Sequence, residues 1–328
     1  MRRRAFIEGI AASATWPLAA HAQQEARVRR VGILMPYAKG DAENEARVQA
    51  LKQKLVDFGW VQGRNIQFDE RWTTDNMDAV RSQAASLMAS NPDVVVATGG
   101  RVIPVLMQLS NSIPIVVPGG GDPVRQGYAK SLARPGGNVT GFALFELSTL
   151  GKSIEILKQI APGVARVALI YNPDNPVSPI FRQIAEEASG SFGIKPIAAP
   201  IHGLDDIDRA VSSLGDGRNS GVYFLPDVTT LGLRKEIIEL TARHAVPAMY
   251  WDASFVKIGG LVFYGVDRAE IFRQSASYVD RILRGERAED LPFQEPTKYL
   301  LSINLRTATA LGLNIPQPLL ATANEVIE

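Results

Sequence analysis

The sequence predicts an α/β protein built from two lobes, each with a parallel sheet covered by helices on both faces. Three observations lead to this prediction. Short apolar runs rich in β-branched residues alternate with segments of helical spacing, and the connections between them are short. The alternation runs through two successive series, the second of which starts after Gly141. No stretch is rich enough in proline or serine to be a flexible tether, so several short crossings should join the lobes.

The first series opens with a buried strand over 31–35 and a helix over 41–58, which Gly59 ends. Its remaining elements continue the same alternation up to residue 117. They are a strand around Ile66 and Phe68, a helix over 77–89, a strand over 93–97, a helix over 101–109 and a strand over 113–117.

The second series repeats this architecture without a repeat at the level of residues. Its predicted helices cover 151–160, 178–188, 205–214 and 231–244, and its predicted strands cover 166–171, 195–199, 221–225 and 246–250. A third part breaks the alternation. It consists of a strand over 259–267, an amphipathic helix over 268–283, a strand over 299–303 and a helical tail.

The stretch over 113–141 carries the clearest local signals. Three consecutive glycines follow its strand at 119–121, and Asp122-Pro123 then has the form of a helix N-cap and first turn. A Gly/Pro cluster at 135–138 ends this predicted helix and leads into a strand over 139–141. Ligands of open α/β sheets bind outside the carboxyl ends of strands, where this loop would lie. A tight strand-to-helix connection without a ligand accounts for the same residues equally well.

Composition excludes several classes of protein. The chain has 328 residues, 46% of them hydrophobic, and a formal net charge of +1, whereas a nucleic-acid partner would require a basic stripe. It contains no cysteine, which excludes thiol catalysis, disulfides and cysteine-ligated zinc. We therefore expect an ordinary globular protein with no nucleic-acid partner.

The first 22 residues have the form of a secretory signal peptide. Three arginines at 2–4 precede a short, mostly apolar stretch over 7–20, and Ala20-His21-Ala22 fits a cleavage site. The pair Arg3-Arg4 indicates the twin-arginine variant. The apolar stretch is too short to span a bilayer. We therefore expect export to the periplasm.

Motifs for covalent catalysis are absent from the sequence. Val124 stands where the dinucleotide fingerprint needs its third glycine, and there is no P-loop, H-E-x-x-H or G-x-S-x-G motif. The two histidines beyond the leader, His202 and His244, stand outside any catalytic motif and are most simply structural. We expect no enzyme, no catalytic residue, no metal site and no cofactor.

Polar and aromatic residues instead gather where the predicted strands end. A cleft with apolar walls and a few placed polar groups is how proteins hold small ligands. Each aromatic residue taken alone is more simply explained as core packing. The candidate ligand-binding residues are Tyr37, Thr98, Gly99, Gly100, Asp122, Pro123, Asn172, Asp227, Tyr250, Ser254 and Tyr264.

Longer motifs occur in a fixed order along the chain after the leader. They are GDPV at 121–124, SLARPGGNVTG at 131–141, GK at 151–152, IAPGVARVALIYNP at 160–173, GGxxxYGxD at 259–267, DLPFQEPTKYLLSINLRTATALGL at 290–313 and PQPLLATANEVIE at 316–328. In their order and spacing these motifs resemble those of the ABC transporter substrate-binding proteins, in particular members proposed to bind tryptophan and tyrosine. The resemblance covers nearly the whole chain after the leader.

The resemblance implies a type I periplasmic-binding-protein fold, with two doubly wound lobes, a hinge of three crossings and a ligand cleft between the lobes. We expect residues 28–146 and 268–288 to form one lobe, and residues 147–267 and 289–328 the other. The implied function is the capture of a small molecule for an ABC permease in the inner membrane, by a monomer that closes about its hinge. The alternative is a periplasmic ligand-sensing subunit of a signalling system.

The resemblance also points to an amino acid, with aromatic ones favoured. Asp122 or Asp227 would then bind the ammonium group, and Thr98 with the amides of Gly99 and Gly100 would bind the carboxylate. A tyrosine at 37, 250 or 264 could stack on an aromatic side chain. The competing interpretation makes Asp122 a helix cap only.

Overall fold

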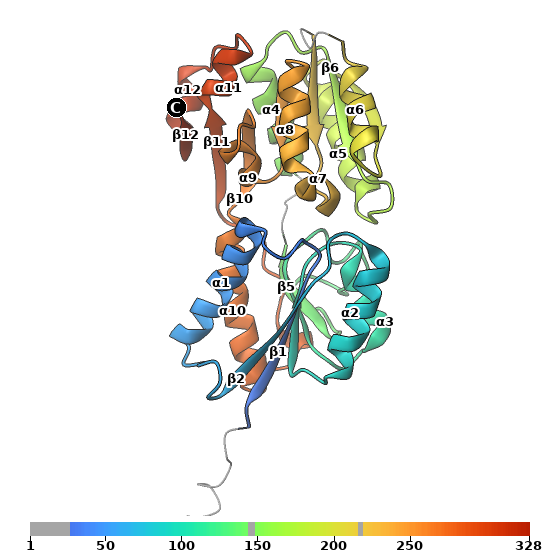
Figure 1. The fold of residues 1–328 in the computed structure, drawn as a ribbon, viewed down its shortest axis with the longest axis vertical. Coiled ribbons are helices and arrows are strands. Elements are labelled where there is room, and N and C mark those ends of the chain that lie inside the picture. Colours follow the sequence, from blue (N-terminus) through green and yellow to red (C-terminus); the bar gives the residue numbers. More distant parts are fainter. Residues whose placement is uncertain (1–26, 144–147, 216–218) are drawn as a thin grey trace, which may run out of the picture.

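The computed structural model describes residues 27–143, 148–215 and 219–328. The chain forms two α/β lobes that lie one above the other (Figure 1). The predicted signal peptide over 1–22 lies outside the described residues. The described helices include none that is both long and apolar enough to span a membrane.

The first lobe contains a parallel five-stranded sheet of order β2-β1-β3-β4-β5. Alternate strand residues point to its two faces, so Ile33 packs on the side of α1 and α10 while Leu34 packs on the side of α2 and α3. The strands are β1 (Arg29–Met35), β2 (Ile66–Trp72), β3 (Val94–Ala97), β4 (Ile115–Gly120) and β5 (Val139–Ala143). The helices are α1 (Ala42–Asp57), α2 (Met77–Ala89), α3 (Val102–Leu109) and α10 (Arg268–Leu283).

The second lobe contains a seven-stranded sheet of order β12-β11-β10-β9-β8-β6-β7. All pairs are parallel except β10 with β11, where the chain re-enters the lobe from the opposite direction. Its strands are β6 (Arg166–Tyr171), β7 (Lys195–Pro200), β8 (Ser220–Phe224), β9 (Ala248–Tyr250), β10 (Val262–Val266), β11 (Tyr299–Asn304) and β12 (Glu325–Ile327).

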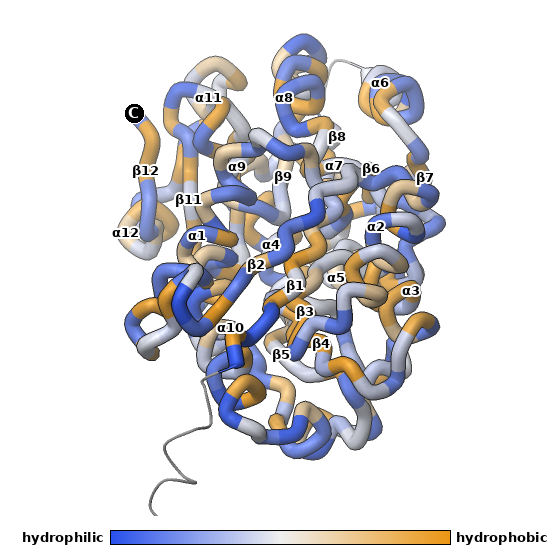
Figure 2. The backbone as a smooth tube through the Cα atoms, turned by 60° about the horizontal axis from the view of Figure 1, so that its bottom comes forward, coloured by the Kyte–Doolittle hydropathy of each residue, from blue (hydrophilic) through white to orange (hydrophobic). Residues whose placement is uncertain are grey.

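Helices cover both faces of the second sheet. One cluster of buried apolar side chains joins Leu157 and Phe181 to one face of the strands, and another joins Ile207 and Ile237 to the other face. The helices are α4 (Ser148–Ile160), α5 (Ser178–Ser191), α6 (Leu204–Ser212), α7 (Val228–Gly232), α8 (Arg234–Arg243), α9 (Ala253–Lys257), α11 (Leu305–Ala310) and α12 (Gln317–Thr322). Figure 2 shows the apolar residues concentrated along the strands inside this covering.

The chain passes between the lobes three times: from β5 to α4, from β10 to α10, and from the short 3-10 helix Ala288–Asp290 to β11. The residues at which the lobes divide stay a prediction. The hydrogen bonds, however, place 291–294 against the first sheet. Thr140 Oγ1 donates to the Leu291 carbonyl at 2.6 Å, and the Gln294 amide donates to the Gly141 carbonyl at 3.0 Å.

Most predicted elements are confirmed, and α2, β6 and α10 match their predicted bounds to the residue. The helix expected after Asp122 is wrong. Asp122 caps a single turn, with the Gln126 amide donating to its carbonyl at 3.0 Å, and Gly127 at φ 75° then turns the chain away. The helix expected over 231–244 divides at Leu233 into α7 and α8, and the short elements α9 and β12 were not predicted.

Candidate functional site

A cavity lies between the lobes, at the ends of the strands that face the other lobe. Both lobes contribute to its walls, which are mostly apolar. Its lining residues from the first lobe are Tyr37, Thr98, Gly99, Gly100, Ile103, Val117, Gly119, Gly120, Gly121, Gln126, Tyr128 and Arg268. Those from the second lobe are Asn175, Val177, Phe181, Pro226, Asp227, Val228 and Trp251.

Glycines line the wall that the first lobe contributes, in the turns after β3 and β4. Gly99 and Gly119 adopt φ values of 100° and 90°, which residues with a side chain rarely take up. Gly100 lets the second lobe approach closely, since a Cβ atom there would lie 2.5 Å from Asn175 Oδ1. The glycines therefore allow both the tight turns and the close approach of the two lobes.

A short relay of hydrogen bonds fixes the polar edge of this wall. The Tyr128 hydroxyl donates to the Gly100 carbonyl at 3.1 Å, so its oxygen accepts from Gln126 Nε2 at 3.0 Å. Because Gln126 uses its Nε2 atom toward Tyr128, its Oε1 atom points away from Tyr128. That oxygen is buried and has no hydrogen-bond partner among the described residues. Gln126 thus presents an acceptor at the cavity wall.

The second lobe contributes a buried carboxylate, that of Asp227. The residue is 5% exposed and caps α7, accepting from the Thr229 amide at 2.9 Å and from Asn175 Nδ2 at 2.8 Å. Burial raises the pKa of Asp227 above its ordinary value, although these hydrogen bonds and the charge of Arg101 act in the opposite sense. A buried carboxylate of this kind is stabilised by a cation placed in the cavity.

Two arginines and one aspartate meet at the side of the cavity where α10 begins. Asp252 accepts from Arg47 Nη2 at 2.8 Å and from Arg268 Nη1 at 2.9 Å, and all three side chains are buried. Arg47 comes from α1, Arg268 from the start of α10 and Asp252 from the loop after β9. Burial alone would raise the pKa of Asp252, but the two guanidinium groups hold it well below its usual range. We call these three residues the arginine–aspartate cluster.

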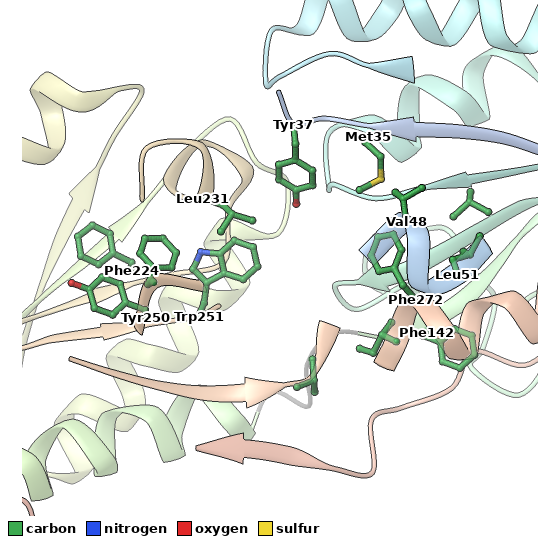
Figure 3. Packing of buried hydrophobic residues seen from close by; sticks show 14 of the residues in the cluster. Met35, Tyr37, Val48, Leu51, Phe142, Phe224, Leu231, Tyr250, Trp251 and Phe272 are labelled. Atoms are coloured by element: carbon green, nitrogen blue, oxygen red, sulfur yellow. The ribbon is translucent and has the colours of Figure 1, made fainter. Parts of the chain in front are cut away.

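Aromatic rings adjoin this cluster and continue the apolar contact between the lobes. Arg268 lies 5.1 Å from the Trp251 ring centroid and 5.8 Å from that of Tyr37, both within the range of cation–π attraction. In Figure 3, Tyr37 of the first lobe points toward Leu231 and Trp251 of the second. One cluster of buried apolar side chains therefore includes residues of both lobes.

Further polar contacts hold the lobes together outside the cavity. Arg234 Nη1 lies 2.7 Å from Asp41 Oδ2, Thr229 Oγ1 donates to Asp75 Oδ2 at 2.8 Å, and Lys257 Nζ lies 3.0 Å from Glu43 Oε1. Each joins a residue of the first lobe to one of the second. The structure thus represents the lobes closed on each other.

The family comparison decides the identity of the chain. Residues 31–327 match the model of the ABC transporter substrate-binding protein family. The chain belongs to this family. This confirms the resemblance drawn from the motifs, and the fold is that of the type I periplasmic binding proteins.

Known relatives of this substrate-binding protein share its fold over most of its length. A tyrosine-binding protein of Clostridioides difficile strain R20291 is 23% identical over 287 residues, which is 87% of this chain and 81% of the relative. A conserved domain protein from Vibrio cholerae has a TM-score of 0.85 at 26% identity, covering 92% of this chain and all of that one. A Streptococcus ABC domain in complex with L-Trp has a TM-score of 0.81 at 20% identity, covering 90% of this chain and all of that one.

Five of the candidate residues of this substrate-binding protein line the cavity: Tyr37, Thr98, Gly99, Gly100 and Asp227. Asp122 and Pro123 lie in the turn after β4 but outside the lining. Asp122 Oδ1 accepts from the Val124 and Arg125 amides, both at 3.0 Å, which is the capping role that competed with ligand binding. Ligand contact by any of these residues stays a prediction.

The other candidates take part in packing or support. Asn172 donates to Thr229 Oγ1 at 3.0 Å, and the Ser254 hydroxyl donates to Asp252 Oδ1 at 2.6 Å. Tyr250 is 1% exposed and stacks on both Phe224 and Phe255 in the second lobe. Tyr264 stacks on Tyr299 with ring centroids 5.9 Å apart, beside a separate surface groove.

Several lining residues were not among the candidates chosen from the sequence. Gln126 and Tyr128 lie in the segment wrongly expected to be helical, and Asn175 lies in a strand-end loop from which only Asn172 was chosen. Trp251 directly follows the chosen Tyr250 and the end of β9. Arg268 is the first residue of a helix, and no local signal distinguishes it from an exposed arginine. In the part of the chain that the structure describes, no group of three or more metal-binding side chains occurs.

Proposed function

We propose that this protein is the extracytoplasmic solute-binding component of an ABC importer and that it binds a free amino acid between its lobes. The observation that carries the proposal is Asp227, a buried carboxylate in the wall of a mostly apolar cavity. An ammonium group bound beside Asp227 would form an ion pair with this carboxylate. Binding would involve hinge closure and no covalent change, as suits a family of solute-binding proteins.

The cavity walls favour a ligand with an aromatic side chain. Tyr37, Phe181 and Trp251 contribute aromatic surface, and Ile103 and Val177 contribute aliphatic surface. Aromatic pairs add roughly 0.5–1.5 kcal/mol beyond the burial of area. The tyrosine and tryptophan named for two relatives are consistent with this preference.

The proposal extends to where the protein works. The leader over 1–22 would direct a monomer to the periplasm, where it would deliver its ligand to a permease in the inner membrane. Neighbouring genes for a permease and an ATPase would support transport. A neighbouring gene for a membrane kinase would support the sensing alternative.

Mass spectrometry of ligand that co-purifies with the native protein tests the proposal, followed by calorimetry with the twenty amino acids. We expect L-tryptophan or L-tyrosine to bind, and saturation with it to reduce the radius of gyration in small-angle scattering. The reason is electrostatic, because closure around the ligand places its ammonium group against the buried carboxylate of Asp227. A protein that binds none of the amino acids would contradict the proposed function.

Replacing Gly100 by alanine should weaken ligand binding without unfolding either lobe. The new Cβ atom would lie 2.5 Å from Asn175 Oδ1, whose amide also donates to Asp227. Overpacking of this kind costs roughly 1–3 kcal/mol, so we expect about tenfold lower affinity for the ligand. Calorimetry measures the loss, and an unchanged melting temperature of the ligand-free variant shows that the lobes are intact. Wild-type affinity would mean that the lobes close less tightly than the structure indicates.

A further inference from the structure

We infer that Arg268 binds the carboxylate group of the ligand, a role that rests on the proposed amino-acid function and deepens it. Together with Asp227, Arg268 would make the cavity a receptor for a zwitterion. The inference differs from the expectation at the sequence level, which gave the carboxylate to Thr98 and the amides of Gly99 and Gly100.

The first observation is an unused donor. Arg268 lines the cavity and is 7% exposed, and its Nε atom is buried with no hydrogen-bond partner among the described residues. Its other two nitrogens are engaged, Nη1 with Asp252 at 2.9 Å and Nη2 with the Tyr37 hydroxyl at 3.1 Å. A buried donor without a partner is costly, and a guanidinium group is suited to carboxylate oxygens.

The second observation is the charge of the arginine–aspartate cluster. Within the described parts of the chain, the salt bridges of Arg47 and Arg268 both go to the same carboxylate, that of Asp252. Two positive charges and one negative charge leave the buried cluster with a net charge of one positive unit. Burial first, and then the charge of Arg268, lower the pKa of Arg47. A ligand carboxylate beside Arg268 would neutralise this excess.

The third observation is that Arg268 is held in place before any ligand arrives. Asp252 fixes one end of the guanidinium group, Tyr37 fixes the other, and the Trp251 ring lies 5.1 Å away. Asp252 and Tyr37 are therefore positioning residues. A donor that is already fixed loses little conformational entropy when it binds.

Asp227 supplies the opposite charge in the same cavity. It belongs to the second lobe, while Arg268 begins the helix that packs on the first. A zwitterion that contacts both residues would link the two lobes, which explains why its binding favours the closed form. A ligand that lacks either its ammonium or its carboxylate group would leave the charge of Asp227 or of Arg268 without a partner.

Calorimetry with L-tryptophan and L-tryptophanamide tests the inference, with L-tyrosine and L-tyrosinamide as a second pair. The amide keeps the ammonium group and the ring but has no carboxylate. We expect the wild-type protein to bind the acid about 100-fold more tightly than the amide, since losing a buried charged partner has effects of this size. We expect Arg268→Gln to reduce this ratio to about threefold or less while changing the affinity for the amide little.

Arg234→Gln is the matched control. Arg234 also joins the lobes, through Asp41 at 2.7 Å, but it does not line the cavity, so the ratio of acid to amide affinity should stay at the wild-type value.

Removing Arg268 leaves Arg47 and Asp252 as a neutral pair, so Arg268→Gln should fold. If Arg268→Gln does not fold, Arg268→Lys replaces it in the test. Lysine keeps the positive charge but loses the planar guanidinium donor, so the ratio of acid to amide affinity should fall below the wild-type value without reaching one.

The outcomes separate the inference from the proposed function. A wild-type ratio near one, or a large ratio that persists in the Arg268 variants, would overturn the role of Arg268 and leave amino-acid binding intact. In the second case Thr98→Val should lower the ratio instead. A wild-type protein that binds no amino acid would overturn the proposed function, and the role of Arg268 with it.

Discussion

Replacing Asp227 by asparagine is expected to lower the affinity for the amino-acid ligand by about 30- to 5,000-fold, which corresponds to about 2–5 kcal/mol. The variant keeps the size of the side chain and can still cap α7 through the Thr229 amide. It loses the charge that would pair with the ligand ammonium group. Calorimetry with L-tryptophan and L-tyrosine measures the effect.

The stability of ligand-free Asp227→Asn should not fall in parallel with its affinity for the ligand. The pKa of Asp227 is raised in the folded protein, so burial of its ionised form opposes folding above the ordinary pKa of an aspartate. Asparagine removes this unfavourable term but also loses the hydrogen bond from Asn175 Nδ2, so the melting temperature at pH 7 should change little. By the same reasoning, affinity in the wild type should fall as acid protonates Asp227, and the variant should lack that pH dependence.

Asp122→Asn provides the matched control, because Asp122 is also an aspartate that caps a turn in a loop at the end of a strand. It lies outside the lining, so its charge should contribute little to binding. Equal losses in the two variants would show that the affinity depends on capping rather than on the charge of Asp227.

Asp252→Asn should strongly destabilise the folded protein. Removing the carboxylate leaves Arg47 and Arg268 buried beside each other without an anion, and breaking a buried pair in this way costs about 3–5 kcal/mol. Denaturant unfolding of the ligand-free protein measures the change. Glu286→Gln is the control, since its pair with Arg281 is exposed to solvent and its loss should change stability little.

Acid titration gives a second test of Asp252. Its pKa lies well below the ordinary value in the folded state, so its ionisation adds stability that is fully present above pH about 4. That stability is lost as the pH falls from there toward the folded pKa. The wild type should therefore lose stability steeply below pH about 4, and Asp252→Asn should lose less over the same interval. Parallel curves for the two proteins would contradict a paired, ionised Asp252.

Local signals in the sequence were sufficient for most of the fold. α10 matches its predicted bounds to the residue, and in the structure Asp267 caps its start and Gly285 follows its end. These signals were misleading where a short stretch has the residues of a helix start but the folded chain does not continue as a helix. Asp122-Pro123 is a good helix start, but Gly127 ends the segment after one turn. Short elements such as β12 form only because a neighbouring strand, β11, lies beside them.

The candidate site was predictable only in part, because it depends on which strand ends meet across the cleft. Thr98, Gly99 and Gly100 follow a buried strand, so their place at the cavity could be expected. Tyr250 was chosen as an aromatic residue of a strand-end loop, but it packs inside the second lobe, while the next residue, Trp251, lines the cavity. Arg268 could not be predicted as a site residue, because its partners Tyr37 and Asp252 lie 231 and 16 residues away in the sequence.

The three passages of the chain between the lobes also govern the order in which the protein can fold during synthesis. The first sheet leaves the ribosome early, but α10, which packs on α1 and covers one face of that sheet, leaves only after most of the second lobe. Trp60 and Asp280, which are hydrogen-bonded at 2.8 Å, are 220 residues apart. The central strands of the second lobe, β6 to β9, follow one another closely in the sequence and can pair without a distant segment of the chain. We therefore expect the core of the first lobe to stay incomplete until α10 emerges, so that a nascent chain stalled before residue 268 would present a partly uncovered apolar sheet face to chaperones.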